Sequence, residues 1–166
     1  MNLFVLDRDP RVAALYHCDK HVVKMTLETA QILSTVCHQI GFTFEGQYRQ
    51  THANHPCTVW ARSSRENYAW ALQLLEELGK EYSHRYGRRH ASTALLEALR
   101  GCPTRLLMAA EAMTPFAQAM PEEYRQEDPV AAYRSYYLGE KRGMLSYTNR
   151  DVPRWVVAHL EIQGEH

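Results

Sequence analysis

Four polar side chains near the start of the chain share the spacing of one helix face: His21, Lys24, Glu28 and Gln31. At 100° per residue they fall on a narrow stripe, which His17 extends if the helix begins before it. Most other positions from Val22 to Ile40 are apolar. Charged groups buried without partners are costly, so we predict that the stripe lines a cavity or binds a ligand, as the floor of an active site would.

The stripe offers groups for proton transfer and for nucleophilic attack. The Glu28 carboxylate can move protons, Lys24 can attack an electrophilic carbon if apolar surroundings favour its neutral amine, and the His21 imidazole can carry protons near pH 7. We therefore predict these three as catalytic residues. The alternative is an ordinary surface ion pair between Lys24 and Glu28, four residues apart, with the histidines incidental.

A metal site is a second possibility at the same place. His17 and His21 are four residues apart and could bind a divalent metal together with Glu28 and a histidine from a loop. The sequence has no HExxH motif, which would identify a general base for such a centre. The predicted activity is then a metal-dependent hydrolase acting on a nucleotide or modified base.

Residues that could bind a substrate lie in two further groups. The loop around His52, Asn54 and His55 leads into a helix at Pro56, and helix N-termini favour phosphate. The alternative for Asn54 is that it caps this helix.

The second group lies at the two ends of the next helix. Arg65 is near its start, and Tyr86, Arg88 and His90 follow near its end, where they suit phosphates and stacked bases. A basic C-terminus is also favoured by the helix dipole alone. Three tyrosines farther on could stack on bases, but their spacing is more typical of a packed helix face: Tyr133, Tyr136 and Tyr137.

The elements that carry these residues are predicted to be helical. Residues 2–6 form a short apolar run, either a strand or an extended arm. Asp9-Pro10 opens a helix that reaches Ile40, or breaks near Asp19. A second helix runs from Pro56 to Tyr86, with Ser63 and Glu66 at capping-box spacing.

The rest of the chain continues the helical pattern. Ser92 can cap a short helix that ends at Arg100, and Asp128-Pro129 opens a helix that extends to Met144. With no repeat and no glycine-rich turn between a strand and a helix, the sequence predicts an all-α bundle formed by one domain, residues 1–166.

Composition bounds the function classes. The chain has 166 residues, 45% of them hydrophobic and 23% charged, as in ordinary globular proteins. Four separated cysteines, no signal sequence and no long apolar stretch predict a cytoplasmic protein without a membrane partner. Lysines and arginines equal the acidic residues at 19 each, so net charge does not by itself favour nucleic acid.

The order of several pieces resembles the phage endonuclease V, or pyrimidine-dimer DNA glycosylase, family. These pieces are the apolar run at residues 2–6, the helix bearing Glu28, the Asn54-His55-Pro56 turn, and the helix end at residues 82–90. The likeness covers roughly the first half of the chain. The second half, including residues 114–125, is more similar to small phage-borne proteins of unassigned function.

The resemblance implies an all-α enzyme that cuts the glycosidic bond of a damaged pyrimidine and then nicks the DNA backbone without a cofactor. Family members use the N-terminal amine as nucleophile and a carboxylate to steer protons, which implies Glu28 here. An initiator Met before Asn2 is not expected to be removed, so the nucleophile does not carry over directly, and Lys24 is an alternative. A non-catalytic phage interaction protein is the remaining hypothesis.

Overall fold

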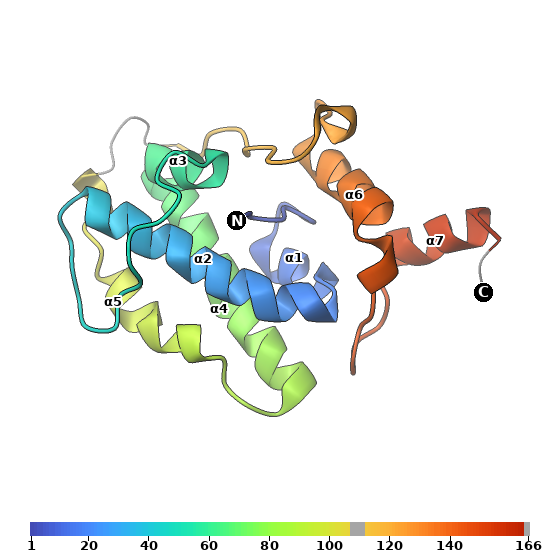
Figure 1. Ribbon diagram of the computed structural model, residues 1–166, viewed down its shortest axis with the longest axis horizontal. Helices are drawn as coiled ribbons and strands as arrows, with labels where there is room; N and C mark the ends of the chain where they lie inside the picture. Colours follow the sequence, from blue (N-terminus) through green and yellow to red (C-terminus); the bar gives the residue numbers. More distant parts are fainter. Residues whose placement is uncertain (107–111, 165–166) are drawn as a thin grey trace.

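The computed structural model describes residues 1–106 and 112–164, whose regular structure is entirely helical (Figure 1). The α-helices there are α1 (Pro10–Tyr16), α2 (Asp19–Gln39), α3 (Pro56–Ser63), α4 (Arg65–Tyr86), α5 (Leu96–Arg100), α6 (Pro129–Glu140) and α7 (Arg154–Ile162). Short 3-10 helices are η1 (Ala91–Leu95), η2 (Thr104–Leu106), η3 (Glu122–Tyr124) and η4 (Arg142–Met144). The predicted all-α class is confirmed, since these residues form no strand or sheet.

The long helix α2 packs against α4, and α1, α3 and η1 surround this pair (Figure 1). Its buried side chains include Val22, Ile32 and Leu33, which join Leu74 and Leu78 of α4 in the core. Residues 2–6 are buried although they form neither helix nor strand. This arm brings the N-terminus into the space between α2, α3 and α6 (Figure 1).

The predicted helix from residue 10 to residue 40 breaks into α1 and α2. His17 and Cys18 have extended backbone, and Asp19 opens α2. The Asp19 carboxylate accepts hydrogen bonds from the Thr148 backbone (2.9 Å) and from Arg85 (3.0 Å). Because these contacts fix the junction, His17 lies outside the helix that carries the polar stripe.

Two buried charges on α4 connect this junction to the C-terminal part of the chain. Arg85 donates to Glu81 (2.8 Å) and to Asp19 (3.0 Å), and its side chain has no exposed surface. Glu81 also receives two hydrogen bonds from Arg150, at 2.8 and 2.9 Å. Since each buried charge has a partner, the network holds α2, α4 and residues 146–150 together without the cost of unpaired charges.

Several helix caps differ from the sequence prediction. The helix from residue 56 breaks at Ser64, whose hydroxyl accepts from the Asn67 backbone (3.0 Å), so the predicted Ser63–Glu66 capping box is wrong. His90, not Ser92, caps η1 through its Nδ1 (3.1 Å). Ser92 is instead buried and bonded to Tyr48 (2.8 Å). Each cap depends on side-chain hydrogen bonds and buried partners, which the spacing of residues in the sequence does not reveal.

The tyrosines of α6 are mostly core, as predicted. Tyr133 and Tyr137 are fully buried, and Tyr136 is half-buried. The helix ends at Glu140 rather than at Met144, because residues 142–144 tighten into η4.

All four cysteines are buried and free. None of the helices in the described residues combines the length and the apolar character needed to cross a membrane.

Candidate active site

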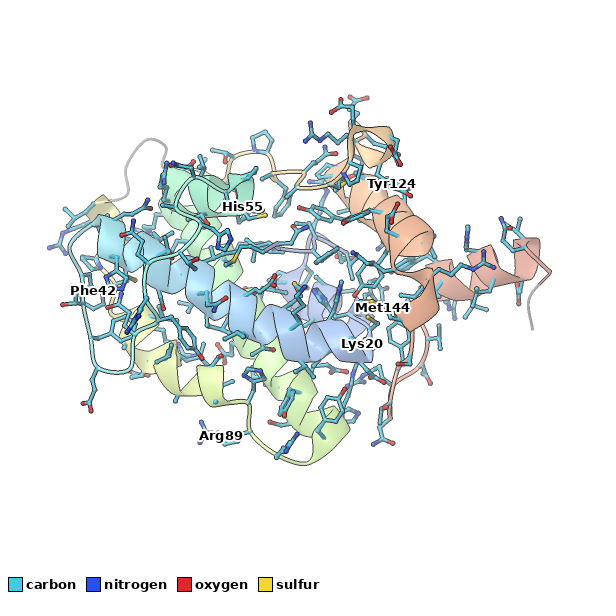
Figure 2. The ribbon with its side chains drawn as sticks, in the orientation of Figure 1. Lys20, Phe42, His55, Arg89, Tyr124 and Met144 are labelled. Atoms are coloured by element: carbon cyan, nitrogen blue, oxygen red, sulfur yellow. The ribbon has the colours of Figure 1, made fainter. Side chains whose placement is uncertain are left out.

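The N-terminal residues of the chain lie against the Glu28 carboxylate. The Met1 amine is 3.5 Å from Oε2 of Glu28, and the Asn2 backbone nitrogen donates to the same oxygen at 3.0 Å. The buried arm therefore places an amine beside the only carboxylate of α2 other than Asp19 at its first position. Figure 1 marks the N-terminus beside α2 and α3, and Figure 2 labels His55 at the start of α3.

The Glu28 carboxylate and the Met1 amine differ in solvent exposure, and this difference suits proton transfer from the amine. The Glu28 side chain is 11% exposed and that of Met1 only 4%, yet Met1 as a whole is half-buried. The solvent-accessible part of Met1 is therefore mainly its backbone end, which carries the amine. A nearly buried carboxylate next to an accessible amine can accept a proton from it and leave a neutral nucleophile.

Asn2 is held on every polar atom of its side chain. Its Oδ1 accepts from the Tyr133 hydroxyl (3.0 Å) and from the Cys57 thiol (3.4 Å). Its Nδ2 donates to the Ala119 carbonyl (2.8 Å). The position of the amine beside Glu28 is thus linked to α3 and to the second half of the chain.

Lys24 is the second cation beside Glu28. Its Nζ is 3.6 Å from Oε1, and its side chain is 62% exposed. The Lys24 side chain therefore lies largely in solvent rather than in apolar surroundings, and its role as nucleophile stays a prediction. Gln31 is half-buried farther along the same helix face.

The loop before α3 brings further imidazoles to this region. His55 caps α3 by accepting from the Cys57 backbone at 3.1 Å, so the alternative that Asn54 caps it is wrong. Burial, then the positive charges of the N-terminal amine and of His52, lowers the His55 pKa. His52 is exposed with a left-handed backbone, φ 47°, and its Nδ1 contacts Thr51. Asn54 is exposed beside it.

His21 is on the stripe but faces the protein interior. Its ring packs against Phe4 at 4.5 Å and against Tyr137 at 5.1 Å, measured between centroids. Burial, with the nearby charges of His17, Lys141 and Lys24, lowers its pKa to about 3. His21 is therefore neutral near pH 7, behind the arm that carries the amine.

The predicted metal ligands do not converge. Among the described residues no group of three His, Cys, Asp or Glu side chains is placed to hold a metal ion, so His17, His21 and Glu28 do not form one site. His17 is fully buried, with Nδ1 bonded to the Ala13 carbonyl (2.6 Å). Burial lowers its pKa to about 4.

The predicted aromatic and basic cluster lies on another side of α2. Tyr86 donates to the Asp19 carbonyl (3.3 Å), and Nε2 of His90 contacts the Val23 carbonyl (3.1 Å). Both ring nitrogens of His90 therefore have partners within the fold. Arg88 is exposed, 5.8 Å from the centre of the Tyr82 ring.

Arg65 is at the start of α4, exposed and 3.8 Å from Glu66. Within the described part of the chain its ion pair is with this neighbour rather than with the Glu28 region, so its substrate role stays a prediction.

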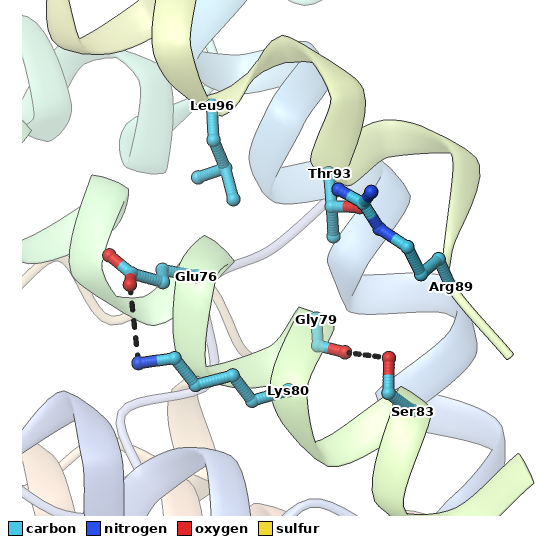
Figure 3. A pocket seen from close by; sticks show the side chains of 7 residues that line it. All are labelled: Glu76, Gly79, Lys80, Ser83, Arg89, Thr93 and Leu96. Atoms are coloured by element: carbon cyan, nitrogen blue, oxygen red, sulfur yellow. Dashed lines mark hydrogen bonds and ion pairs between the residues drawn. The ribbon is translucent and has the colours of Figure 1, made fainter. Parts of the chain in front are cut away.

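A separate hollow of about 360 Å³ lies between α4 and η1 (Figure 3). It is lined by Glu76, Gly79, Lys80, Ser83, Arg89, Thr93 and Leu96. Its Lys80 is already paired with Glu76 (3.2 Å) and Glu77 (2.8 Å). Of its lining residues only Arg89 belongs to the aromatic and basic cluster predicted at the end of α4.

Sequence reasoning missed the residues that hold the amine. The sequence pattern places Asn2 in an apolar run and Tyr133 in the core, and it gives Cys57 no role. The one usable signal was a polar Asn at the head of the apolar run 3–6. The contact between residues 2 and 133 has no counterpart in local spacing.

Comparison with known proteins gives one match. The family model described as pyrimidine dimer DNA glycosylase matches residues 1–94. That segment includes the arm, Glu28, His55 and the end of α4. No curated protein and no solved structure matches the chain.

Proposed function

The chain belongs to the pyrimidine dimer DNA glycosylase family, and we propose that it releases damaged or modified pyrimidines from DNA and then cleaves the strand. One observation carries this proposal: an accessible amine lies 3.5 Å from the nearly buried Glu28 carboxylate. The matched segment contains both groups. Family membership favours this function over the metal-dependent enzyme and the non-catalytic protein.

The chemistry needs only an amine and a proton carrier. Glu28 accepts a proton from the ammonium, and the neutral amine attacks C1′ of the damaged nucleotide while the bond from C1′ to the base breaks. The base departs with the bonding electrons and takes up a proton. Opening of the sugar ring breaks C1′–O4′ and forms a Schiff base. Loss of a C2′ proton then expels the 3′ phosphate and cuts the strand.

Three nitrogens are candidates for the nucleophile. The amine of the half-buried Met1 lies beside Glu28, and the Asn2 nitrogen is closer but is an amide while Met1 is attached. Lys24 is exposed and adjacent to the other carboxylate oxygen. We favour the amine of the first residue, because the arm fixes its position. The Lys24 side chain is exposed, and lysine side chains are flexible.

The distribution of charge along the chain supports DNA as the substrate, although the net charge of the chain is zero. From residue 20 to residue 65 the acidic residues are Glu28 and Glu45 alone. The lysines and arginines of the same stretch are Lys20, Lys24, Arg49, Arg62 and Arg65. In Figure 2, His55 and Arg89 lie on opposite sides of α2, with Lys20 toward one end. On α2 itself the exposed charged side chains are Lys20 and Lys24, so phosphate groups that approach the exposed face of α2 meet cations.

The exposed face of α2 also carries apolar surface. Val23 is 42% and Leu27 36% exposed, next to Lys24. A nucleotide turned out of a duplex needs both phosphate contacts and apolar surface for its base. This strip, between the amine and the Tyr86–His90 cluster, provides both.

The test is incision of a duplex that carries one pyrimidine dimer, with the undamaged duplex as the matched control. We expect the wild-type chain to cut only the damaged duplex and Glu28→Gln to leave both intact. Equal cutting of the two duplexes would refute the proposed function. So would a chain that cuts neither duplex and binds both no better than background.

A further inference from the structure

The arm that presents the amine has no regular structure to fix its register. Residues 1–5 lie outside every helix, and the described residues contain no sheet to hold them. Residues 2 and 3 donate hydrogen bonds to the side chains of Glu28 and Cys57 and to the distant Ala119 carbonyl, and Asn2 accepts one from Tyr133. Their geometry therefore depends on a few specific partners, among which Tyr133 is the most distant in sequence.

Tyr133 connects the arm to the stretch that precedes η3. Its hydroxyl lies 3.0 Å from Oδ1 of Asn2 and 2.8 Å from the Ala117 carbonyl, and it accepts from the Ala119 backbone at 3.2 Å. Asn2 donates to the Ala119 carbonyl in turn. Asn2 and Tyr133 thus share partners in residues 117–119 and form one connected unit.

The protonation states of Tyr133 and Cys57 determine the orientation of the Asn2 side-chain amide. Burial raises the pKa of Tyr133 well above its usual range and raises that of Cys57 to about 11. Both groups keep their protons near neutral pH: the Cys57 thiol can donate to the Asn2 carbonyl oxygen, and the single hydroxyl proton of Tyr133 is shared between that oxygen and the Ala117 carbonyl. The amide group of Asn2 therefore has its oxygen toward these donors and its nitrogen toward Ala119.

We propose that Tyr133 is a positioning residue, which keeps the amine in register with Glu28 by holding the Asn2 side chain. This inference rests on the proposed function. Tyr133 lies on α6, outside the matched residues 1–94, so the second half of the chain takes part in the reaction geometry. A displacement of about 1 Å between reacting groups can slow a reaction by about 100-fold.

The first test compares two tyrosines of the same helix. Tyr133→Phe removes the hydroxyl that contacts Asn2, whereas Tyr137→Phe removes an equally buried hydroxyl that contacts Cys18. On a duplex with an abasic site, we expect kcat to fall about 10-fold or more in Tyr133→Phe with KM unchanged. Tyr137→Phe should keep the wild-type kcat, although its thermal midpoint of unfolding should fall about as much as that of Tyr133→Phe.

The second test measures the position of the amine without using catalysis. An amine-reactive acylating reagent is added, and peptide mass spectrometry gives the labelling rate of the first residue. We expect faster labelling in Tyr133→Phe than in the wild type, because the amine leaves Glu28. Tyr137→Phe should label at the wild-type rate.

A third variant covers the case in which Tyr133→Phe does not fold. Asn2→Leu keeps the size of the side chain but removes its hydrogen bonds, and it should reproduce the loss in kcat and the faster labelling. If both single variants fold, the double variant should be no slower than either one, since they act as a unit.

Two results would overturn the inference. One is equal kcat and equal labelling in the Tyr133→Phe and Tyr137→Phe variants, and the other is fully additive effects of Asn2→Leu and Tyr133→Phe. A wild-type chain that never cuts abasic DNA would refute the proposed function instead. The labelling rates would then still decide whether Tyr133 fixes the amine.

Discussion

The backbone nitrogen of Asn2 donates a 3.0 Å hydrogen bond to Oε2 of Glu28, the oxygen that also lies 3.5 Å from the Met1 amine. One carboxylate oxygen thus anchors the arm and, in the proposed mechanism, also receives a proton from the amine. On the other side, Oε1 of Glu28 is 3.6 Å from Lys24. Removing the charge of Glu28 should therefore affect chemistry more than folding.

Glu28→Gln should slow incision by about 100-fold to 10,000-fold, the usual contribution of a positioned proton-transfer group. The amide oxygen of Gln can still accept from Asn2, so the arm should stay in place. Single-turnover incision of the damaged duplex measures the effect, with duplex binding and the thermal midpoint as controls. A near wild-type rate would exclude Glu28 from the chemistry.

Lys24→Met should leave covalent attachment to an abasic site intact. Lys24 is 62% exposed, and its contribution is expected to be a contact with phosphate rather than nucleophilic attack. We expect duplex affinity to fall by a few-fold while the yield of borohydride-trapped adduct at saturating protein is unchanged. Loss of the adduct with binding retained would assign the nucleophile to Lys24.

Duplex binding should weaken as salt rises, because phosphate contacts release counterions. Lys20→Gln and Arg88→Gln should each lower affinity and reduce the slope of log K against log salt by about 0.9 for each lost contact. Lys80→Gln is the matched control, since Lys80 is paired with Glu76 and Glu77. A slope that the first two variants leave unchanged would place the DNA elsewhere.

Folding stability should fall as the pH drops below about 6.5, the ordinary pKa of histidine. Burial lowers the pKa of His17 to about 4 and that of His21 to about 3, so the unfolded chain binds protons that the folded chain does not. Between pH 6.5 and pH 5 each histidine should cost roughly 2 kcal/mol of unfolding free energy.

Urea unfolding at pH 7.5 and pH 5.0 measures this loss. His21→Phe should remove about one proton from the pH dependence, because Phe does not titrate. An unchanged pH dependence in that variant would show that His21 is not held neutral in the folded state.

The fold class could be predicted because local signals agree with the final structure. Asp9 before Pro10 and Asp128 before Pro129 both act as caps, accepting from Arg11 and Val130. Gly87 ends α4 with a left-handed backbone, φ 66°. The breaks at Asp19 and Ser64 were harder to place, because distant partners such as Thr148 and Arg85 decide the first one.

The stripe on α2 identified Glu28 but not its partners. Helical spacing finds side chains on one face, so it grouped Glu28 with Lys24 and His21. It could not show that the arm covers His21 or that Lys24 is in solvent. The contact between Asn2 and Tyr133 spans 131 positions and depends on tertiary packing that spacing does not encode.

The most direct measurement of the central claim is borohydride trapping on a duplex with one abasic site, with chelator present and the adduct located by peptide mass spectrometry. The same spectra identify the first residue of the purified chain, Met1 or Asn2. We expect one adduct, on the α-amine of that first residue, and none with Glu28→Gln. An adduct on Lys24, or no adduct with the wild-type chain, would contradict the assignment of the amine beside Glu28 as the nucleophile.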